Sequence, residues 1–454
     1  MTNPSPPAPA PLTRGIIARY AAGSLGTGGF ATLPGLVLVY YLTDTLGVTA
    51  IMAGLILTLA KIWDVFIDPI LGSLSDRQLA RTGSRRGSML IGAIALPCAF
   101  VLTFAVIPGL GPVVSAIWVL VAFILCATSF SLFQVPYVVL PAELAPTYDG
   151  RTRMLTWRVV VLTLAILLFG AGGPELRGLF PQNPTLGYLV MAVAAALVLC
   201  VGMLIATSVA PRGAPAQTLP PRVSPLGHYR DGILALRRSQ PFRALLGTFM
   251  LQGLATGMML AGAQFVATWV LNDEGAVTPL FASLIAPALL VAPLWGWLAK
   301  RWGKERMFLA ASSLFTLAAL ALIPMIWVPG FWIVVPVALA GAGYAGMQSL
   351  PMSMLPDVID HDARQHGPGR AGTFGGVWTA GETAGMAFGA TALTLVLSAT
   401  GYLETVGTQS VSQPGSAIVG IVLSFSLVPA LVMLLSLTVL RRYRLRRSDL
   451  EGVA

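Results

Sequence analysis

The sequence predicts an all-α membrane protein of twelve transmembrane helices, arranged as two six-helix bundles related by a pseudo-two-fold repeat. Three observations lead to this fold class: the composition, the succession of long apolar segments, and two patterns that recur in both halves. Hydrophobic residues make up 56% of the 454 residues and charged residues only 10%, and the mean hydropathy is +0.79. A soluble domain carries about 25% charged residues, so this chain cannot cover a globular surface with polar groups.

The apolar segments follow one another at lengths that suit a bilayer. A hydrocarbon core about 30 Å thick needs about 20 apolar residues in a helix. Twelve segments meet this requirement, at about residues 16–43, 49–75, 88–108, 113–141, 155–173, 186–209, 243–272, 278–299, 307–326, 331–356, 371–400 and 415–440. The three cysteines all fall in these segments, which indicates small core residues rather than disulfides or metal ligands.

Basic residues predict the orientation of the chain. Arginines and lysines collect after every second segment, whereas Arg177 is the one basic residue in the loops on the other side. Under the positive-inside rule this places both termini in the cytoplasm, as in a protein of a plasma (bacterial inner) membrane. The net charge of +10 then reflects topology and contact with anionic membrane lipids, and no nucleic-acid partner is expected.

Polar stretches divide the chain into five predicted regions. The Pro-rich residues 1–14 are expected to form a disordered cytoplasmic tail, and they lack the pattern of a signal peptide. The Pro-rich stretch 210–242 predicts a cytoplasmic linker between an N-terminal six-helix bundle at 15–209 and a C-terminal six-helix bundle at 243–440. A basic cytoplasmic tail is expected at 441–454.

Two patterns recur at corresponding places in the halves. DPILGSLSDR (68–77) ends the second segment and APLWGWLAKR (292–301) ends the eighth, with Pro, Gly and Leu at the same spacing. PYVVLPAE (136–143) and PMSMLPDV (351–358) end the fourth and the tenth. A parallel six-helix repeat of this kind is typical of the major facilitator fold, in which substrate binds between the halves near the midplane.

Three charged residues lie within the apolar second segment, in KIWDVFIDP (61–69). Asp64 and Asp68 are four residues apart and share a helix face, which Lys61 joins. A charge near the bilayer centre costs roughly 2.5 kcal/mol or more, and two carboxylates cannot both ionise cheaply there unless a cation lies between them. The pattern predicts a site for a monovalent cation, either sodium or a proton. The alternative is a structural ion pair with Lys61 or Arg158 that holds helices together.

Longer segments resemble one known family. KIWDVFIDPILG (61–72) resembles the helix-II signature of the glycoside–pentoside–hexuronide:cation symporters of the major facilitator superfamily, which melibiose permease typifies. PYVVLPAELAPTYDGRTRMLTWR (136–158) resembles the family's helix IV–V segment, and LPDVIDHDARQHGPGRAGTFGGVW (355–378) its helix X–XI connection. The resemblance covers nearly all of residues 15–440. It implies a symporter that imports a small polar solute, most simply a sugar or glycoside, by alternating access with H⁺ or Na⁺ and without a cofactor.

The resemblance and the charge pattern together give the candidate site residues. The cation ligands implied by the resemblance are Asp64, Asp68 and Ser131, and Ile67 replaces an Asn that is frequent in sodium-using members, which favours proton coupling. Lys61 and Asp76 are candidate gating residues, because Asp76 resembles the acid of a facilitator loop motif at the membrane edge. The candidate substrate-binding residues are Gln134, Arg158, Trp378, Glu382 and Thr383.

Alternatives to a sugar symporter stay open at this point. The solute could be a lysolipid or an organic acid, because animal lysolipid symporters look like relatives of the same family. A membrane enzyme is disfavoured, because no catalytic or metal-binding constellation falls in the apolar segments; the acids and histidines near Asp360 are expected to form a solvated ion-pair cluster. A transport-inactive assembly or sensor protein is disfavoured by the cost of keeping Asp64 and Asp68 in the membrane. The expected partners are a solute, a monovalent cation and lipids around a monomer.

Overall fold

The computed structural model describes residues 12–145, 148–211, 234, 236–366, 371–407 and 411–445. Across these residues the chain is helical, with one isolated β-bridge between Leu46 and Val406. Twelve segments are long and apolar enough to cross a membrane. The predicted fold class and number of spans are confirmed.

The helices form two groups of six spans. In the first group α1 (Arg14–Tyr40) continues into a π-helical turn (Tyr41–Thr45), followed by α2 (Ala50–Thr82), α3 (Arg86–Phe104), α4 (Pro112–Leu144), α5 (Tyr148–Gly178) and α6 (Pro184–Thr207). In the second group α8 (Gln240–Phe265) continues into a π-helical turn (Val266–Val270), followed by α9 (Val277–Trp302), α10 (Lys304–Leu320), α11 (Val334–His366), α12 (Ala371–Ala399), α13 (Gly415–Phe425) and α14 (Leu427–Leu440). Short 3₁₀ turns lie at Glu274–Ala276, Ile323–Ile326 and Phe331–Ile333.

The last span differs from the single helix expected at 415–440. It is broken at Ser426, whose φ of −129° and ψ of −81° lie outside the helical region. Pro429 follows three residues later, and proline has no N–H to donate to the carbonyl four residues before it. The chain therefore continues as a second helix, α14, rather than as one straight rod.

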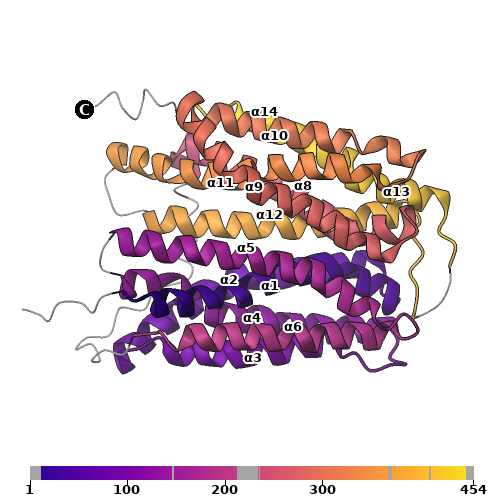
Figure 1. The fold of residues 1–454 in the computed structure, drawn as a ribbon, viewed down its shortest axis with the longest axis horizontal. Helices are drawn as coiled ribbons and strands as arrows, with labels where there is room; N and C mark the ends of the chain where they lie inside the picture. The colour runs from indigo at the N-terminus through magenta and orange to yellow at the C-terminus, as the bar shows by residue number, and fades with distance from the viewer. Residues whose placement is uncertain are drawn as a thin grey trace, which may run out of the picture.

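The two groups repeat the same packing scheme. In the first group α1 packs against α5 and α6, and α3 against α4 and α6; in the second group α8 packs against α12 and α14, and α10 against α11 and α14. Figure 1 shows the helices running along one axis, with α1–α6 (indigo to magenta) below α8–α14 (salmon to yellow). The matching pairs are what an internal repeat predicts.

The repeat extends to a backbone irregularity. Each π-helical turn closes with a leucine N–H, Leu46 bonding to Tyr41 O at 3.2 Å and Leu271 bonding to Val266 O at 2.9 Å. The next residue in each case has a positive φ, 65° at Gly47 and 54° at Asn272. Asparagine is one of the few residues besides glycine that tolerates this left-handed conformation. The two halves therefore leave their first helix in the same way.

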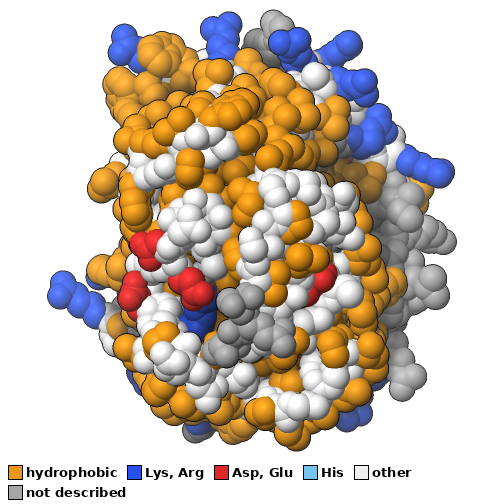
Figure 2. Space-filling view, turned by 90° about the vertical axis from the view of Figure 1, so that its right-hand side faces the viewer, with side chains coloured by type: hydrophobic (Ala, Val, Ile, Leu, Met, Phe, Trp, Pro, Cys, Tyr) orange, Lys and Arg blue, Asp and Glu red, His pale blue; other side chains and the backbone are white. Residues whose placement is uncertain are grey.

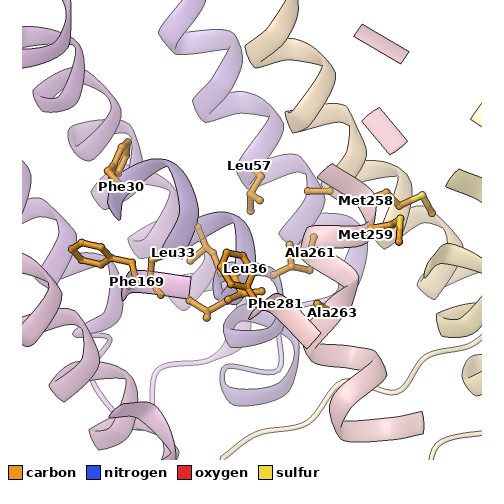
Figure 3. Close-up of a cluster of buried hydrophobic side chains, with 14 of the residues drawn as sticks. Phe30, Leu33, Leu36, Leu57, Phe169, Met258, Met259, Ala261, Ala263 and Phe281 are labelled. Atoms are coloured by element: carbon orange, nitrogen blue, oxygen red, sulfur yellow. The ribbon is translucent and has the colours of Figure 1, made fainter. Parts of the chain in front are cut away.

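The groups meet along α1, α2 and α5 on one side and α8, α12 and α9 on the other. Figure 3 shows apolar side chains from both groups, and Leu36 of α1 and Phe281 of α9 lie close together in this seam. Two glycines permit the close approach: a Cβ at Gly54 would clash with Thr394, and a Cβ at Gly170 would clash with the Phe281 ring.

Candidate functional site

The charged residues of the second span lie together on α2. Asp64 is buried, with 6% of its surface exposed, and its Oδ2 lies 3.0 Å from the Lys61 Nζ. Asp68 follows one turn later and is half-buried. The buried Ser131 of α4 makes a side-chain hydrogen bond to Asp68. The structure thus brings Lys61, Asp64, Asp68 and Ser131 into one site between α2 and α4.

The two carboxylates carry unsatisfied oxygen atoms. Asp64 Oδ1 and Asp68 Oδ1 are each buried without a hydrogen-bond partner in the described part of the chain. A buried acceptor that lacks a partner costs about 1–3 kcal/mol, and more when it is charged. A proton or a small cation placed against these oxygens would remove that cost.

Two of the predicted substrate-binding residues lie on the same group of helices. The Oε1 of Gln134 on α4 is buried and has no hydrogen-bond partner in the described residues. The same holds for the Nε of Arg158 on α5. The Arg158 Cζ lies 5.5 Å from the centroid of the Tyr137 ring. Tyr137 stacks on Tyr20 of α1 with ring centroids 4.7 Å apart. This arrangement positions the guanidinium through aromatic contacts and leaves two buried polar atoms without partners among the described residues.

The other three predicted substrate-binding residues lie on α12, in the second group. Trp378 is 2% exposed and stacks on Phe249 of α8 with centroids 4.5 Å apart; its Nε1 is buried and lacks a partner among the described residues. Glu382 lies one turn further and is half-buried near Tyr344 of α11. Thr383 is also half-buried. Trp378 is therefore packed in the core, whereas Glu382 and Thr383 retain exposed surface.

Asp76 lies at the membrane edge and pairs within its own group. Its Oδ1 is 2.6 Å from Arg85, and Arg85 also contacts Glu143 of α4 at 2.7 Å. Burial lowers the pKa of Arg85, but the hydrogen bonds to Glu143 and Asp76 outweigh this effect and raise the pKa above its ordinary value. Lys304 and Asp357, 2.6 Å apart, form the matching pair in the second group. In this conformation Asp76 joins α2 to the start of α3 and to α4, rather than joining the two groups.

The opposite end of the molecule holds a polar cluster that the sequence did not reveal. Asp44, in the π-helical turn after α1, is 6% exposed. Its Oδ1 accepts hydrogen bonds from the Tyr402 hydroxyl at 2.5 Å and the Trp269 Nε1 at 3.3 Å. Both donors belong to the second group. Burial, together with the nearby Asp44, raises the pKa of Tyr402 well above its ordinary value, so the phenol keeps its proton.

Further bonds join the groups at the same end. Arg177 of α5 lies 3.2 Å from Glu274 and between the rings of Tyr40 and Tyr188, at 5.7 and 5.5 Å from their centroids. The backbone N–H of Thr405 donates to Thr43 O at 3.0 Å. A cavity of about 660 Å³ is lined by residues of both groups, including Asp44, Arg177 and Glu274, and Figure 2 shows acidic side chains gathered beside a basic one on this face. We call these contacts the Asp44 closure.

The sequence held a weak signal for the Asp44 closure. Asp44 is an acid at the end of the apolar run GLVLVYYLTDT, and Arg177 is the one basic residue in the loops on its side. Their partners are remote in the chain, since Tyr402 lies 358 residues from Asp44. Spacing rules that apply along a helix cannot predict such a pair.

Comparison with known proteins agrees with this geometry. The sequence model of the family described as MFS/sugar transport protein matches residues 19–447. The chain is 24% identical to the glucuronide carrier protein homolog of Escherichia coli, over 94% of this chain and 92% of that protein. It is 25% identical to the isoprimeverose transporter of Lactiplantibacillus pentosus, over 81% and 76%, and 25% identical to the mouse sodium-dependent lysophosphatidylcholine symporter 1, over 90% and 81%.

Solved structures share the fold at low sequence identity. A mutant of the nucleoside transporter NupG superposes with a TM-score of 0.66 at 12% identity, covering 94% of this chain and all of that one. A bacterial homologue of the lysosomal transporter Spinster, in an inward-facing and unoccupied conformation, superposes with a TM-score of 0.66 at 14% identity, covering 95% and 98%. These matches show the arrangement of the helices.

Proposed function

The chain belongs to the MFS/sugar transport protein family, and from this membership we propose that it is a cation-coupled secondary symporter. It imports a small polar solute, a sugar or glycoside, together with H⁺ or Na⁺. The glucuronide and isoprimeverose carriers among its relatives support a sugar-like solute. The proposed activity is transport across the membrane rather than catalysis.

One observation carries the coupling part of the proposal. Asp64 and Asp68 present two buried, unpartnered oxygens on one face of a membrane-spanning helix, beside Ser131 and Lys61. Intramembrane acids are costly and serve ion pathways by default. The proposed cation site consists of Asp64, Asp68 and Ser131. The proposed solute contacts are Gln134, Arg158, Glu382 and Thr383, and Trp378 is proposed to hold α12 in place by stacking on Phe249 of α8.

The Asp44 closure supports alternating access. Residues 15–209 and 243–440 are proposed to rock against each other, and the contacts among Asp44, Tyr402, Arg177 and Glu274 hold one end shut. Basic residues gather at the other end, which the positive-inside rule places in the cytoplasm together with both termini. In this assignment a monomer in the plasma membrane is closed to the outside, with Lys61 and Asp76 acting on the inner side.

A second solute class has its own support. The mouse relative is named as a lysophosphatidylcholine symporter, and a mostly apolar cavity of about 660 Å³ lies against α1 and α5 with Arg14 and Arg153 in its lining. A long apolar tail with a charged headgroup suits such a cavity. The alternative proposal is an amphipathic, non-sugar solute, carried by the same coupled cycle.

Uptake into proteoliposomes tests both versions. Purified protein is reconstituted and offered glycosides, hexuronates, lysolipids and organic acids, with an imposed pH gradient, an imposed Na⁺ gradient or neither. Gradient-dependent accumulation of one class identifies the solute, and Asp68→Asn should remove it. Asp360→Asn, an exposed acid at the end that carries the basic residues, is the matched control. A folded parent that accumulates no solute under either gradient would contradict the proposal.

A further inference from the structure

Three segments that are far apart in the sequence meet in a small pocket at the end of the molecule opposite the Asp44 closure. The pocket has a volume of about 310 Å³, within the range of small-ligand sites, and it lies where α8 begins, α11 ends and the chain leaves α14. Its lining residues are Arg238, Ser239, Gln240, Pro241, His361, Gln365, Arg444 and Leu445. We call it the Arg238–Arg444 pocket.

The pocket is basic, and its two arginines are not engaged in ion pairs with other described residues. No acidic side chain is among its lining residues, and neither Arg238 nor Arg444 has an ion-pair partner among the residues that the structure describes. Asp357, one turn before His361, is engaged by Lys304 at 2.6 Å. The N-terminus of α8 adds the positive end of a helix dipole. The first turn of α8 holds no acidic residue that would offset this positive charge. The lining residues and the helix end favour an anion, and they outnumber Asp360 and Asp362, the two acids that flank His361 in the chain.

The depth of the pocket in the membrane indicates which anions it can meet. The spans that border it begin at Gln240 and end at Gln365 and Leu440. Two of these helices, with 31 and 35 residues, are longer than the roughly 20 residues that the apolar core needs, so their ends reach the polar headgroup layer. Lipid phosphates lie in that layer. Basic pockets between helices at the cytoplasmic boundary are known to hold anionic headgroups.

We propose that the Arg238–Arg444 pocket binds a phosphate group, supplied by the headgroup of an anionic phospholipid or by free phosphate. Guanidinium groups match phosphate oxygens with paired hydrogen bonds, which a lysine cannot reproduce as well. The start of α8 is already tied to the end of α14, because the Gln240 side chain donates to the Arg442 carbonyl. A bound phosphate would add a bridge from Arg238 to Arg444 and strengthen this junction, independently of the transported solute.

Thermal unfolding of the purified full-length protein tests the site. The protein in neutral detergent is heated with dioleoylphosphatidylglycerol, with dioleoylphosphatidylcholine or with inorganic phosphate. The anionic lipid should raise the midpoint more than the zwitterionic lipid does. The double variant Arg238→Gln with Arg444→Gln should lose most of that difference. The control Arg301→Gln with Arg306→Gln removes the same charge at the same end and should keep it.

Further measurements distinguish a lipid headgroup from free phosphate as the ligand, and they separate loss of binding from misfolding. If inorganic phosphate protects as well as the anionic lipid and loses its effect in the double variant, free phosphate is the ligand. The charge-conserving variant Arg238→Lys with Arg444→Lys should retain part of the lipid effect, which a misfolded protein would not. Equal losses in the two glutamine double variants, or a parent that treats both lipids alike, would overturn the proposal.

Discussion

Asp64 and Asp68 differ in how their charges are compensated. Asp64 has Lys61 at 3.0 Å, whereas the contact of Asp68 is the neutral hydroxyl of Ser131. Asp68 therefore gains more from an arriving cation, and Asp64 is partly neutralised before it arrives. The structural ion pair considered as an alternative is present between Lys61 and Asp64. Lys61 also lies near enough to Asp68 to act on its charge, but Asp68 forms no ion pair of its own among the described residues.

Neutralising either acid should uncouple transport. Asp64→Asn and Asp68→Asn are each expected to abolish gradient-driven accumulation in proteoliposomes while solute exchange persists, because the cation loses a charged ligand. Asp64→Asn should also lower the free energy of unfolding by about 1 kcal/mol, because it removes the ion pair with Lys61, and partly exposed ion pairs contribute about this much. Asp68→Asn should show no such loss. Variants that concentrate solute like the parent would rule out this pair as the cation site.

Tyr402→Phe should weaken the Asp44 closure. Removing one partner of a buried hydrogen bond costs about 1–3 kcal/mol, so the substitution should shift the equilibrium from the outer-closed state by roughly fivefold to a hundredfold. The readout is labelling of a cysteine placed at Thr58, whose hydroxyl faces Thr391 between the two groups, by a membrane-impermeant maleimide added outside. Glu175→Gln, in the lining of the cavity that Asp44 also lines, is the control, and equal labelling in both variants would refute the assignment.

At the scale of the helices, closure depends on how tightly α5 meets α9. Gly170 lies against the Phe281 ring, where an added Cβ would clash, whereas Gly172, two residues on, has open space at its Cβ position. The same substitution at the two positions therefore separates a steric effect from a change in helix propensity. Gly170, in the seam, and Gly172, outside it, therefore form a matched pair of test sites in one helix.

Gly170→Ala should disfavour the closed state, and Gly172→Ala should not. Both variants gain about 1 kcal/mol of helix propensity, but overpacking at Gly170 costs about 1–3 kcal/mol. Outside labelling of the Thr58 cysteine should rise, and uptake should fall, in Gly170→Ala alone. If the two variants behave alike, the contact between α5 and α9 does not hold the closure.

For the whole molecule, the number of oxygen ligands at the proposed cation site is expected to decide whether H⁺ or Na⁺ drives transport. Sodium needs several oxygen ligands, and the side chain before Asp68 is Ile67, which supplies none. A pH gradient should therefore drive uptake at least as well as a Na⁺ gradient of equal size, measured in the same proteoliposomes. Uptake that requires Na⁺ and ignores the pH gradient would contradict this expectation.

The sequence predicted what is local or repeated. The twelve spans follow from apolar length, the repeat from the echoed proline patterns, and the Lys61–Asp64–Asp68 group from helical spacing. The resemblance supplied Ser131, which comes from another helix. The Asp44 closure and the break at Ser426 were not predicted, because the first joins residues remote in the chain and the second depends on how α13 and α14 pack.

The π-helical turns that end the first helix of each half show where the two halves must differ in sequence. Asp44 and Trp269 are the fourth residues of the two turns, and they contact each other, as do the preceding Tyr40 and Phe265, with ring centroids 5.2 Å apart. Corresponding residues that touch lie on the pseudo-two-fold axis, where a dimer of identical six-helix chains would bring each residue against its own copy. Two aspartates facing each other there would repel. An aspartate that accepts from an indole needs unlike residues at the two positions, so this part of the closure requires the two halves to differ in sequence.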